Sequence, residues 1–228
     1  MIKLSLSEAV DHMDGEFYGK DRYFYGVSTD SREINPDELF FALRGPSFNG
    51  NKFSGQALMK NAAACVIDDK NFQSNETILV ENTEIALGKL AKTWRQKVTA
   101  KIIAITGSNG KTSVKEILNN CLSIPAKVLS TDGNLNNHIG LPIMLLRLDE
   151  SHEYSILEMG ANHPKEIDYL VNLTDPFVVV INNAGPAHLE GFIDIKGVAE
   201  AKGEILQGKL PPKYACLNYD DKYYDLWC

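Results

Sequence analysis

A glycine-containing segment between an apolar run and a helical pattern constrains this 228-residue chain more than any other feature of its sequence. The apolar residues 102–106 lead directly into Gly107-Ser108-Asn109-Gly110-Lys111-Thr112. Gly107 and Gly110 can adopt backbone angles that a Cβ disfavours, so the N–H groups of the loop can point at one anion. A helix that starts at Lys111 would direct its positive end toward the same anion. The segment therefore predicts a strand, a phosphate-binding loop and a helix in succession.

Lys111 and Thr112 supply the side chains that a bound nucleotide requires. Lys111 provides a mobile positive charge for the outer phosphates, and the Thr112 hydroxyl can bind Mg²⁺. The motif departs from the common Gly-x-x-x-x-Gly-Lys-Ser/Thr pattern, because Ile105 stands where the first glycine is expected. The alternative interpretation is a glycine-rich turn with a surface lysine. It does not explain why Lys-Thr falls at the start of the helix.

Apolar strands alternate with helices from residue 101 onward. The strands are expected over residues 102–106, 127–130, 154–158, 177–181 and 214–217, and the helices over 111–122, 139–146, 164–173 and 196–207. This alternation predicts a mostly parallel sheet that helices cover on both faces. Ligands bind such sheets at the carboxyl ends of the strands.

The first part of the chain mixes short strands and helices. A capping box at residues 5–8 opens a helix that is expected to end near Met13. Strands are expected over residues 25–28, 39–43, 65–67 and 77–80, and helices over 53–63 and 85–98. We place a domain boundary near residue 83. The predicted α/β organisation is a small mixed N-terminal domain, residues 1–82, followed by an incomplete parallel-sheet domain of the phosphate-loop type, residues 83–228.

Composition excludes several classes of function. A net charge of −7 argues against a nucleic-acid-binding surface. No apolar run approaches the roughly 20 residues of a membrane span, and the first residues lack the pattern of a signal peptide. The four cysteines have no metal-ligand spacing and are expected to be reduced thiols, three of them in core segments. We therefore expect a cytoplasmic protein without membrane insertion, and a monomer.

Polar side chains follow the predicted strands. Glu158 ends an apolar strand near the phosphate loop, and a carboxylate there suits Mg²⁺, although an ion pair or a helix cap is the alternative. His188 follows another strand end, which favours a metal or phosphate role over a structural one. The loop of residues 131–140 carries three asparagines, and it is either a binding loop or a turn with a helix cap. Lys202, taken locally, is a solvated helix lysine.

These residues resemble the Mur ligases, ATP-dependent amide-forming enzymes of peptidoglycan synthesis. Residues 106–112 are similar to the ATP loop of that family, including its departure from the common pattern. Three further segments are similar to the branch that adds D-alanyl-D-alanine: residues 133–142, residues 158–163, and residues 187–192 continuing to 201–205. The resemblance implies a ligase that adds D-alanyl-D-alanine to UDP-N-acetylmuramoyl-tripeptide through an acyl phosphate. Its cofactors would be ATP and Mg²⁺.

The resemblance also implies roles for particular residues. Catalysis would involve Lys111, His188 and a carbamylated Lys202, and the metal would be bound by Thr112, Glu158 and His188. The residues implied for ATP are Thr106, Gly107, Ser108, Asn109, Gly110, Lys111, Thr112, Ser113 and Asn137. Those implied for the other substrates, the uridine nucleotide included, are Thr29, Ser31, Arg32, Ser47, Phe48, Asn134, Asn136, Asn162 and His163.

Members of the family are considerably longer than this chain. They complete the central domain and add a C-terminal ligase domain, which we expect to be absent here, so that these 228 residues alone would be inactive. Two alternatives stay open. One is a non-catalytic nucleotide-binding module, and the other is a different ligase of the same family. A GTPase is disfavoured because the chain has no Asn-Lys-x-Asp segment.

Overall fold

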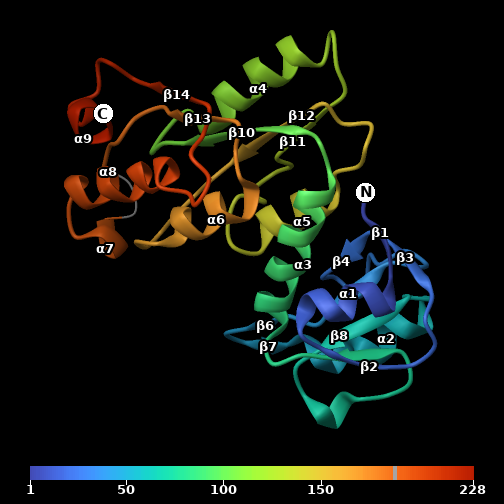
Figure 1. Cartoon of the computed structure of the whole chain (residues 1–228). Helices are drawn as coiled ribbons and strands as arrows, with labels where there is room; N and C mark the ends of the chain where they lie inside the picture. The colour runs from blue at the N-terminus through green and yellow to red at the C-terminus, as the bar shows by residue number, and fades with distance from the viewer. Residues whose placement is uncertain (187–188) are drawn as a thin grey trace. The chain divides into compact units, whose positions relative to one another are not determined.

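A computed structural model describes residues 1–186 and 189–228. The chain forms two compact units (Figure 1): Met1–Lys97 with Leu145–Asp149, and Val98–Met144 with Glu150–Cys228. The boundary expected near residue 83 coincides with the first residue of helix α3 (Thr83–Lys97). The two compact units instead meet at the end of that helix, between Lys97 and Val98. Helix α3 packs against helix α1 (Leu6–Met13) inside the first unit.

The first unit is built on a five-stranded sheet with the order β2-β9-β8-β5-β4. Its strands are β2 (Glu16–Tyr18), β4 (Val27–Ser28), β5 (Leu39–Phe41), β8 (Ala64–Ile67) and β9 (Thr77–Leu79). All pairs are parallel except β2 with β9. The unit also contains two antiparallel pairs, β1 (Lys3–Ser5) with β3 (Tyr23–Tyr25) and β6 (Arg44–Gly45) with β7 (Phe48–Asn49).

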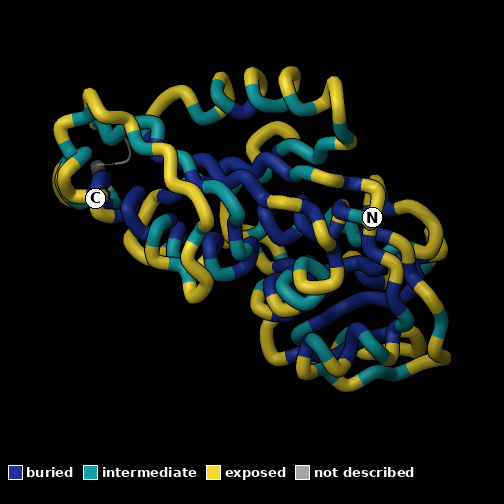
Figure 2. Tube along the Cα trace, turned by 45° about the horizontal axis from the view of Figure 1, so that its top comes forward, coloured by how far each residue is buried: buried dark blue, intermediate teal, exposed yellow. Residues whose placement is uncertain are grey.

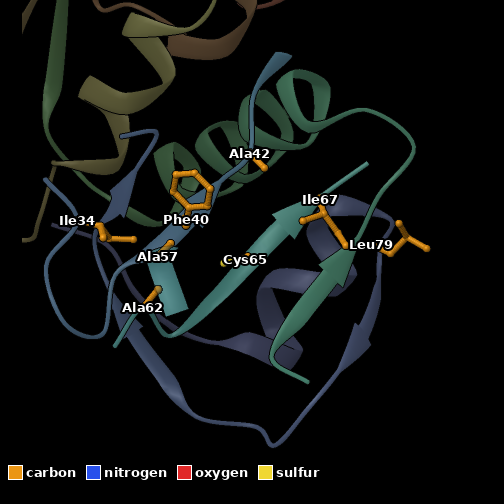
Figure 3. Close-up of a cluster of buried hydrophobic side chains, with 8 residues drawn as sticks. All are labelled: Ile34, Phe40, Ala42, Ala57, Ala62, Cys65, Ile67 and Leu79. Carbon is orange, nitrogen blue, oxygen red and sulfur yellow. The ribbon is translucent and has the colours of Figure 1, made fainter. Parts of the chain in front are cut away.

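The core of the first unit forms around strands β5 and β8, which are buried along their whole length. Figure 3 shows the cluster, whose members are Ile34, Phe40, Ala42, Ala57, Ala62, Cys65, Ile67 and Leu79. Continuous burial is typical of parallel strands covered on both faces. Burial also raises the pKa of the Cys65 thiol to about 12, so this cysteine is an inert core residue.

Two predicted elements of the first unit differ from the structure. The helix expected over 53–63 is a short 3₁₀ turn, η1 (Gly50–Phe53), followed by α2 (Ser54–Met59). It ends early because Asn61 adopts a left-handed backbone conformation, with φ at 64°. The strand expected over 25–28 is divided between β3 and β4 at Gly26, whose φ is 87°. Strands β1, β2, β6 and β7 were not predicted.

A short segment from the middle of the chain completes the first unit. The Ile2 N–H donates to the Leu146 carbonyl at 2.8 Å, and the Trp94 indole N–H donates to the Leu148 carbonyl at 2.9 Å. Leu146 and Leu148 are both buried. The first unit therefore depends on residues that lie about fifty positions beyond the end of helix α3.

The second unit contains the predicted parallel sheet. Its order is β11-β12-β10-β13-β14, and every neighbouring pair is parallel. The strands are β10 (Lys101–Thr106), β11 (Val128–Ser130), β12 (Tyr154–Glu158), β13 (Val178–Ile181) and β14 (Tyr214–Leu217). The predicted α/β class is confirmed, and each of these strands was expected within one residue of its observed bounds at either end.

Helices cover this sheet on both sides, with α4 and α6 opposite each other (Figure 1). The helices of the second unit are α4 (Lys111–Leu122), α5 (Gly140–Leu146), α6 (Glu166–Thr174), α7 (Leu189–Phe192), α8 (Ile195–Gly203) and α9 (Tyr224–Trp227), with a 3₁₀ turn η3 (Glu204–Leu206). The last two residues of α5 belong to the first unit. Val114, Leu118 and Leu122 of α4 pack on the sheet, and the outward turns of this helix are exposed (Figure 2). The helix expected over 196–207 is thus divided into α8 and η3.

The cysteines correct one expectation about the core. Only Cys65 is buried, whereas Cys121, Cys216 and Cys228 are exposed. Cys121 lies on the solvent side of α4, and Cys216 lies on β14, which is an edge strand.

Within the described residues, no helix has the length and apolar character needed to cross a bilayer.

Lysines and aromatic rings alternate at the amino ends of the strands. Lys101 lies over the rings of Tyr154 and Phe177, at 5.9 and 5.3 Å from their centroids. Lys213 lies over Phe177 and Tyr214, at 5.4 and 5.5 Å. We call these five residues the lysine–aromatic row. Cation–π contacts of this kind stabilise the edge of the sheet opposite to the carboxyl ends.

Candidate functional site

The strand register brings the polar residues predicted at strand ends to one edge of the second sheet. Ile105 pairs with Glu158, and Thr106 pairs with Ile181. The residues that follow β10 therefore lie between the end of β12 and the residues that follow β13. Parallel strands present all their carboxyl ends at the same edge, as the sequence predicted.

The phosphate loop is fixed by the segment that follows β13. The Asn183 side chain accepts a hydrogen bond from the Asn109 N–H at 2.9 Å and donates one to the Asn109 carbonyl at 3.1 Å. Asn182 donates to the same carbonyl at 2.7 Å. The Ser108 hydroxyl donates to the Gly185 carbonyl at 3.1 Å. Two asparagine side chains thus hold the tip of the loop in place.

The backbone conformation at Gly110 favours glycine. Its φ of 78° lies in the left-handed region, and an added Cβ would come within 2.6 Å of the Asn182 side-chain nitrogen.

The expectation that the loop N–H groups converge on an anion needs one correction. The N–H of Ser108 donates to the Asn183 carbonyl at 3.0 Å, and the N–H of Asn109 donates to the Asn183 side chain. These two donors are directed at protein acceptors.

Lys111 begins helix α4, as predicted, and its ammonium group lies at the loop. Its Nζ donates to the Gly107 carbonyl at 2.7 Å. Burial lowers the pKa of Lys111, and the nearby Glu158 carboxylate opposes part of that shift. A partly desolvated ammonium beside a glycine loop is well suited to neutralise phosphate oxygens.

Thr112 and Glu158 come together at the start of α4. The Thr112 hydroxyl donates to Glu158 Oε2 at 3.3 Å. Glu158 is only 2% exposed, and its Oε1 has no hydrogen-bond partner among the described residues. A buried carboxylate whose Oε2 lies next to a threonine hydroxyl fits the hard oxygen ligands that Mg²⁺ prefers. Within the described ranges there is no cluster of three or more side chains able to hold a metal.

Lys202 is buried on helix α8, contrary to the surface position that local sequence suggested. It is 2% exposed, and its pKa is lowered to about 8 by burial and by the charge of Lys111. Glu166 and Glu204 oppose part of this shift. The interaction with Lys111 indicates that α8 brings Lys202 close to the phosphate loop. His188, predicted to act with it, lies outside the described residues.

The two glutamates near Lys202 have structural partners. Glu204 accepts from the N–H groups of Lys165 and Asp168, at 2.8 and 3.0 Å, and so caps the start of α6. Glu166 accepts from the Asn162 N–H at 2.6 Å and contacts His163 Nδ1 at 3.1 Å. The predicted substrate residues Asn162 and His163 are therefore positioned by Glu166.

The asparagine loop after β11 has mixed roles. The Asn137 side chain accepts from the N–H groups of Ile139 and Gly140, at 3.2 and 2.8 Å, which is the helix-cap alternative for this residue. Asn136 lies against Gly160, where an added Cβ would meet its side chain at 3.0 Å. Asn134 is exposed, and the Ser113 side chain is exposed on α4. The binding roles implied for these four residues stay predictions.

Thr106 is the last residue of strand β10, and it is buried. Its hydroxyl donates to the Met159 carbonyl at 2.9 Å, which ties β10 to β12 beside the loop. Its expected role in ATP binding stays a prediction.

The first unit contains a separate pocket of about 500 Å³. Its lining residues are Thr29, Asp30, Ser31, Arg32, Phe40, Phe48, Gly50, Phe53 and Gln56. The family resemblance implies a substrate site that includes Thr29, Ser31, Arg32 and Phe48, and all four line this pocket. Ser47 is exposed in the neighbouring β6–β7 turn and is not among the lining residues.

Charges and aromatic rings define this pocket. Arg32 makes a two-pronged ion pair with Asp30, at 2.9 and 2.6 Å, which lowers the pKa of Asp30 to about 2. The Ser31 hydroxyl donates to Gln56 at 2.9 Å. Phe48 and Phe53 are both about half exposed. Their rings can cover a planar group such as a nucleobase.

Sequence reasoning missed Lys115, which contacts Glu158 from helix α4. The available signal was periodicity, because Lys115 shares an inward helical face with Leu118 and Leu122. It also missed the roles of Asn182 and Asn183, which only the register of β10 and β13 reveals.

A parallel sheet with a glycine loop, a lysine and a buried carboxylate at its carboxyl edge is typical of nucleotide-binding enzymes. Residues 105–228 match the family model "Mur ligase middle domain", and residues 23–95 match "Mur ligase family, catalytic domain". The chain belongs to the Mur ligase family, as the resemblance indicated.

Individual relatives agree with this membership. The chain is 42% identical, over 227 residues, to the UDP-N-acetylmuramoyl-tripeptide--D-alanyl-D-alanine ligase of Escherichia coli, covering 100% of this chain and 50% of that protein. Its structure is similar to MurF from Acinetobacter baumannii, with a TM-score of 0.92, 33% identity, and coverage of 100% of this chain and 51% of that one. It is also similar to MurF from Thermotoga maritima in complex with ADP, with a TM-score of 0.79, 34% identity, and coverage of 86% and 46%. The chain spans about half the length of the curated relatives it matches.

Proposed function

We propose that this chain is the substrate- and nucleotide-binding part of an ATP-dependent ligase that joins D-alanyl-D-alanine to UDP-N-acetylmuramoyl-tripeptide. The observation that carries the proposal is the grouping of Lys111, Thr112 and Glu158 around one phosphate loop. The names of the relatives supply the substrate identity, and the bound ADP of the Thermotoga relative supports ATP as the nucleotide. The function belongs to peptidoglycan synthesis, and these substrates favour a cytoplasmic protein.

In the proposed reaction, a carboxylate oxygen of the tripeptide attacks the γ-phosphorus of ATP. The bond from that phosphorus to the β,γ-bridging oxygen breaks, giving an acyl phosphate and ADP. The amine of D-alanyl-D-alanine then attacks the acyl carbon, phosphate leaves, and the nitrogen loses a proton. Both steps bring anions together, so positioning and charge neutralisation dominate catalysis.

The described residues have distinct roles in this scheme. Lys111 neutralises the outer phosphates, and the Asn182–Asn183 clamp keeps the loop in a single conformation. Thr112 and Glu158 would hold Mg²⁺, which supplies charge neutralisation at the phosphates when bound. The first-unit pocket would hold the uridine end, with Phe48 or Phe53 against the base.

Lys202 is proposed to carry a carbamate. Carbamylation requires the neutral amine, and the lowered pKa of this buried lysine increases the neutral fraction. The product is an anion that would replace a buried positive charge beside Lys111. His188 is proposed to act in the same part of the site.

The test uses Lys111→Ala in a chain extended to the length of the relatives. We expect loss of ADP formation and of amide product, because the phosphates lose their main counter-charge. The change is measured as phosphate and ADP release with both peptide substrates present. Near-normal turnover would refute the role of Lys111.

A second candidate is a nucleotide-binding module without catalysis. It is favoured by one observation, that the chain spans about half of each curated relative. The 228-residue chain and the extended chain distinguish the two candidates. We expect both to bind ATP and only the extended chain to form amide product. A product made by the 228-residue chain alone would show that it is a complete catalyst.

A further inference from the structure

Lys115 is a buried cation that the proposed reaction does not yet use. It lies one helical turn after Lys111 on α4 and is only 5% exposed. Lysine is almost never buried to this extent without a partner, because removing an ammonium group from water is costly. Its neighbours on the inward face of α4 are apolar, and an apolar residue would fill this position if packing were the only requirement.

The contacts of Lys115 connect three elements around Glu158. Its Nζ donates to the Thr131 carbonyl at 2.9 Å and lies 3.8 Å from Glu158 Oε1. The Thr131 hydroxyl accepts from the Glu158 N–H at 2.9 Å. Lys115 also pairs with Glu116 at 2.9 Å, but the Glu116 side chain is more than half exposed. Lys115 and Thr131 thus fix both the main chain and the carboxylate of Glu158.

The orientation of the Glu158 carboxylate follows from these contacts. Oε1 faces Lys115, so Oε2 is turned toward the Thr112 hydroxyl at the phosphate loop. Without the lysine, the buried carboxylate would lose the ammonium group beside Oε1 and could rotate away from Thr112. A buried ion pair of this kind contributes more to geometry than to net stability.

We propose that Lys115 is a positioning residue for the divalent cation of the nucleotide. It holds Glu158 with one oxygen toward Thr112, and so sets the affinity for the cation without touching it or the phosphates. This inference rests on the proposed function, in which Thr112 and Glu158 bind Mg²⁺. Replacing a residue that contacts and orients a metal ligand typically lowers metal affinity or activity by about 10- to 100-fold.

The experiment compares Lys115→Met, Lys115→Arg and Glu116→Gln in the 228-residue chain. ATP binding is measured by calorimetry over a series of Mg²⁺ concentrations, and the melting temperature is measured in metal-free buffer. For Lys115→Met we expect the half-saturating Mg²⁺ concentration to rise by about 10- to 100-fold. Lys115→Arg should recover most of the loss, because it keeps the charge. Glu116→Gln, the matched control, should behave like the wild type because its carboxylate is exposed.

Each outcome decides one question. A folded Lys115→Met chain with the wild-type Mg²⁺ dependence would show that Lys115 only joins α4 to the sheet, and would overturn the inference. A shift of equal size in Glu116→Gln would overturn it as well. A folded wild-type chain that binds no ATP at any Mg²⁺ concentration would instead overturn the proposed function.

A second variant covers the case in which Lys115→Met does not fold. Thr131→Val removes the hydroxyl that accepts from the Glu158 N–H and preserves the shape of the side chain. It should raise the half-saturating Mg²⁺ concentration in the same direction. An unchanged value in folded Thr131→Val would then overturn the inference.

Discussion

Lys202 shows how a single buried side chain links the stability of the second unit to pH. Its folded-state pKa is about 8, below the ordinary value of 10.5. Between these values the unfolded chain binds more protons than the folded chain, so the free energy of unfolding rises with pH. Below about pH 8 both states are protonated, and the full cost of burying the charge is present.

We therefore expect Lys202→Met to stabilise the chain at pH 7, by an amount on the order of 3 kcal/mol. The difference from the wild type should shrink as the pH rises above about 8 and disappear near 10.5. Urea unfolding in CO₂-free buffer measures it across this range. A difference that is independent of pH would contradict the assigned cause, and Lys209→Met, at an exposed lysine of the same unit, is the control.

Residues predicted for the site differ in how local their signals are. The grouping of Lys111, Thr112 and Glu158 at one edge of the sheet could be predicted from the sequence, because each occupies a strand end or the helix start beside it. Lys115 could not, because its partners are distant in sequence: Thr131 follows strand β11, and Glu158 ends strand β12. The side chain of Asn137 was open to two interpretations, and its hydrogen bonds to the start of α5 were visible only in the fold.

At the scale of elements, helix α6 depends on a cap that comes from outside its own sequence. Its N-cap residue, Lys165, has a φ of 72° and no side-chain capping bond. The Glu204 carboxylate supplies both acceptors from the turn after α8. A carboxylate at a helix start also interacts favourably with the helix dipole.

Removing this cap should destabilise the second unit. For Glu204→Ala we expect the free energy of unfolding to fall by about 1.5–3 kcal/mol, as for hydrogen bonds to a charged group. Chemical denaturation at neutral pH measures the change. Glu200→Ala on the same segment is the control, because Glu200 is exposed and pairs with the exposed Lys196. Equal effects of the two substitutions would contradict the capping role.

Element prediction worked best where periodicity extended over several residues. Strands β10 and β12 and helix α4 were predicted nearly to the residue, because apolar positions recur at the spacing of a buried strand or an amphipathic helix. Strands β6 and β7 have two residues each, too few to carry a period. The early end of α2 depends on a left-handed Asn61, which sequence patterns indicate only weakly.

At the scale of the whole molecule, the first unit is not continuous in sequence. Residues 145–149 supply acceptors for the Ile2 N–H and the Trp94 indole, and they contribute three buried leucines, Leu145, Leu146 and Leu148. A boundary drawn from sequence alone, at residue 83 or elsewhere, cannot reveal such a contribution. Local patterns carry no information on which distant segment completes a core.

A chain of residues 1–97 should therefore be less stable than the same unit in the full chain. We expect its urea midpoint to be lower, and its Trp94 fluorescence to be shifted to longer wavelength because the indole gains contact with water. The reference is the 228-residue chain with Trp227→Phe, in which Trp94 is the one remaining tryptophan. Equal midpoints would show that residues 145–149 contribute nothing to the first unit.

The lysine–aromatic row lies at the amino ends of the strands of the second sheet, and its cation–π contacts are partly redundant. Phe177 is shared by Lys101 and Lys213, and each of these lysines also touches another ring. Removal of either terminal tyrosine leaves its lysine with a second ring to cover, whereas removal of Phe177 takes a contact from both cations at once. Tolerance to substitution along this edge is thus unequal, and its weak point is the phenylalanine at the centre.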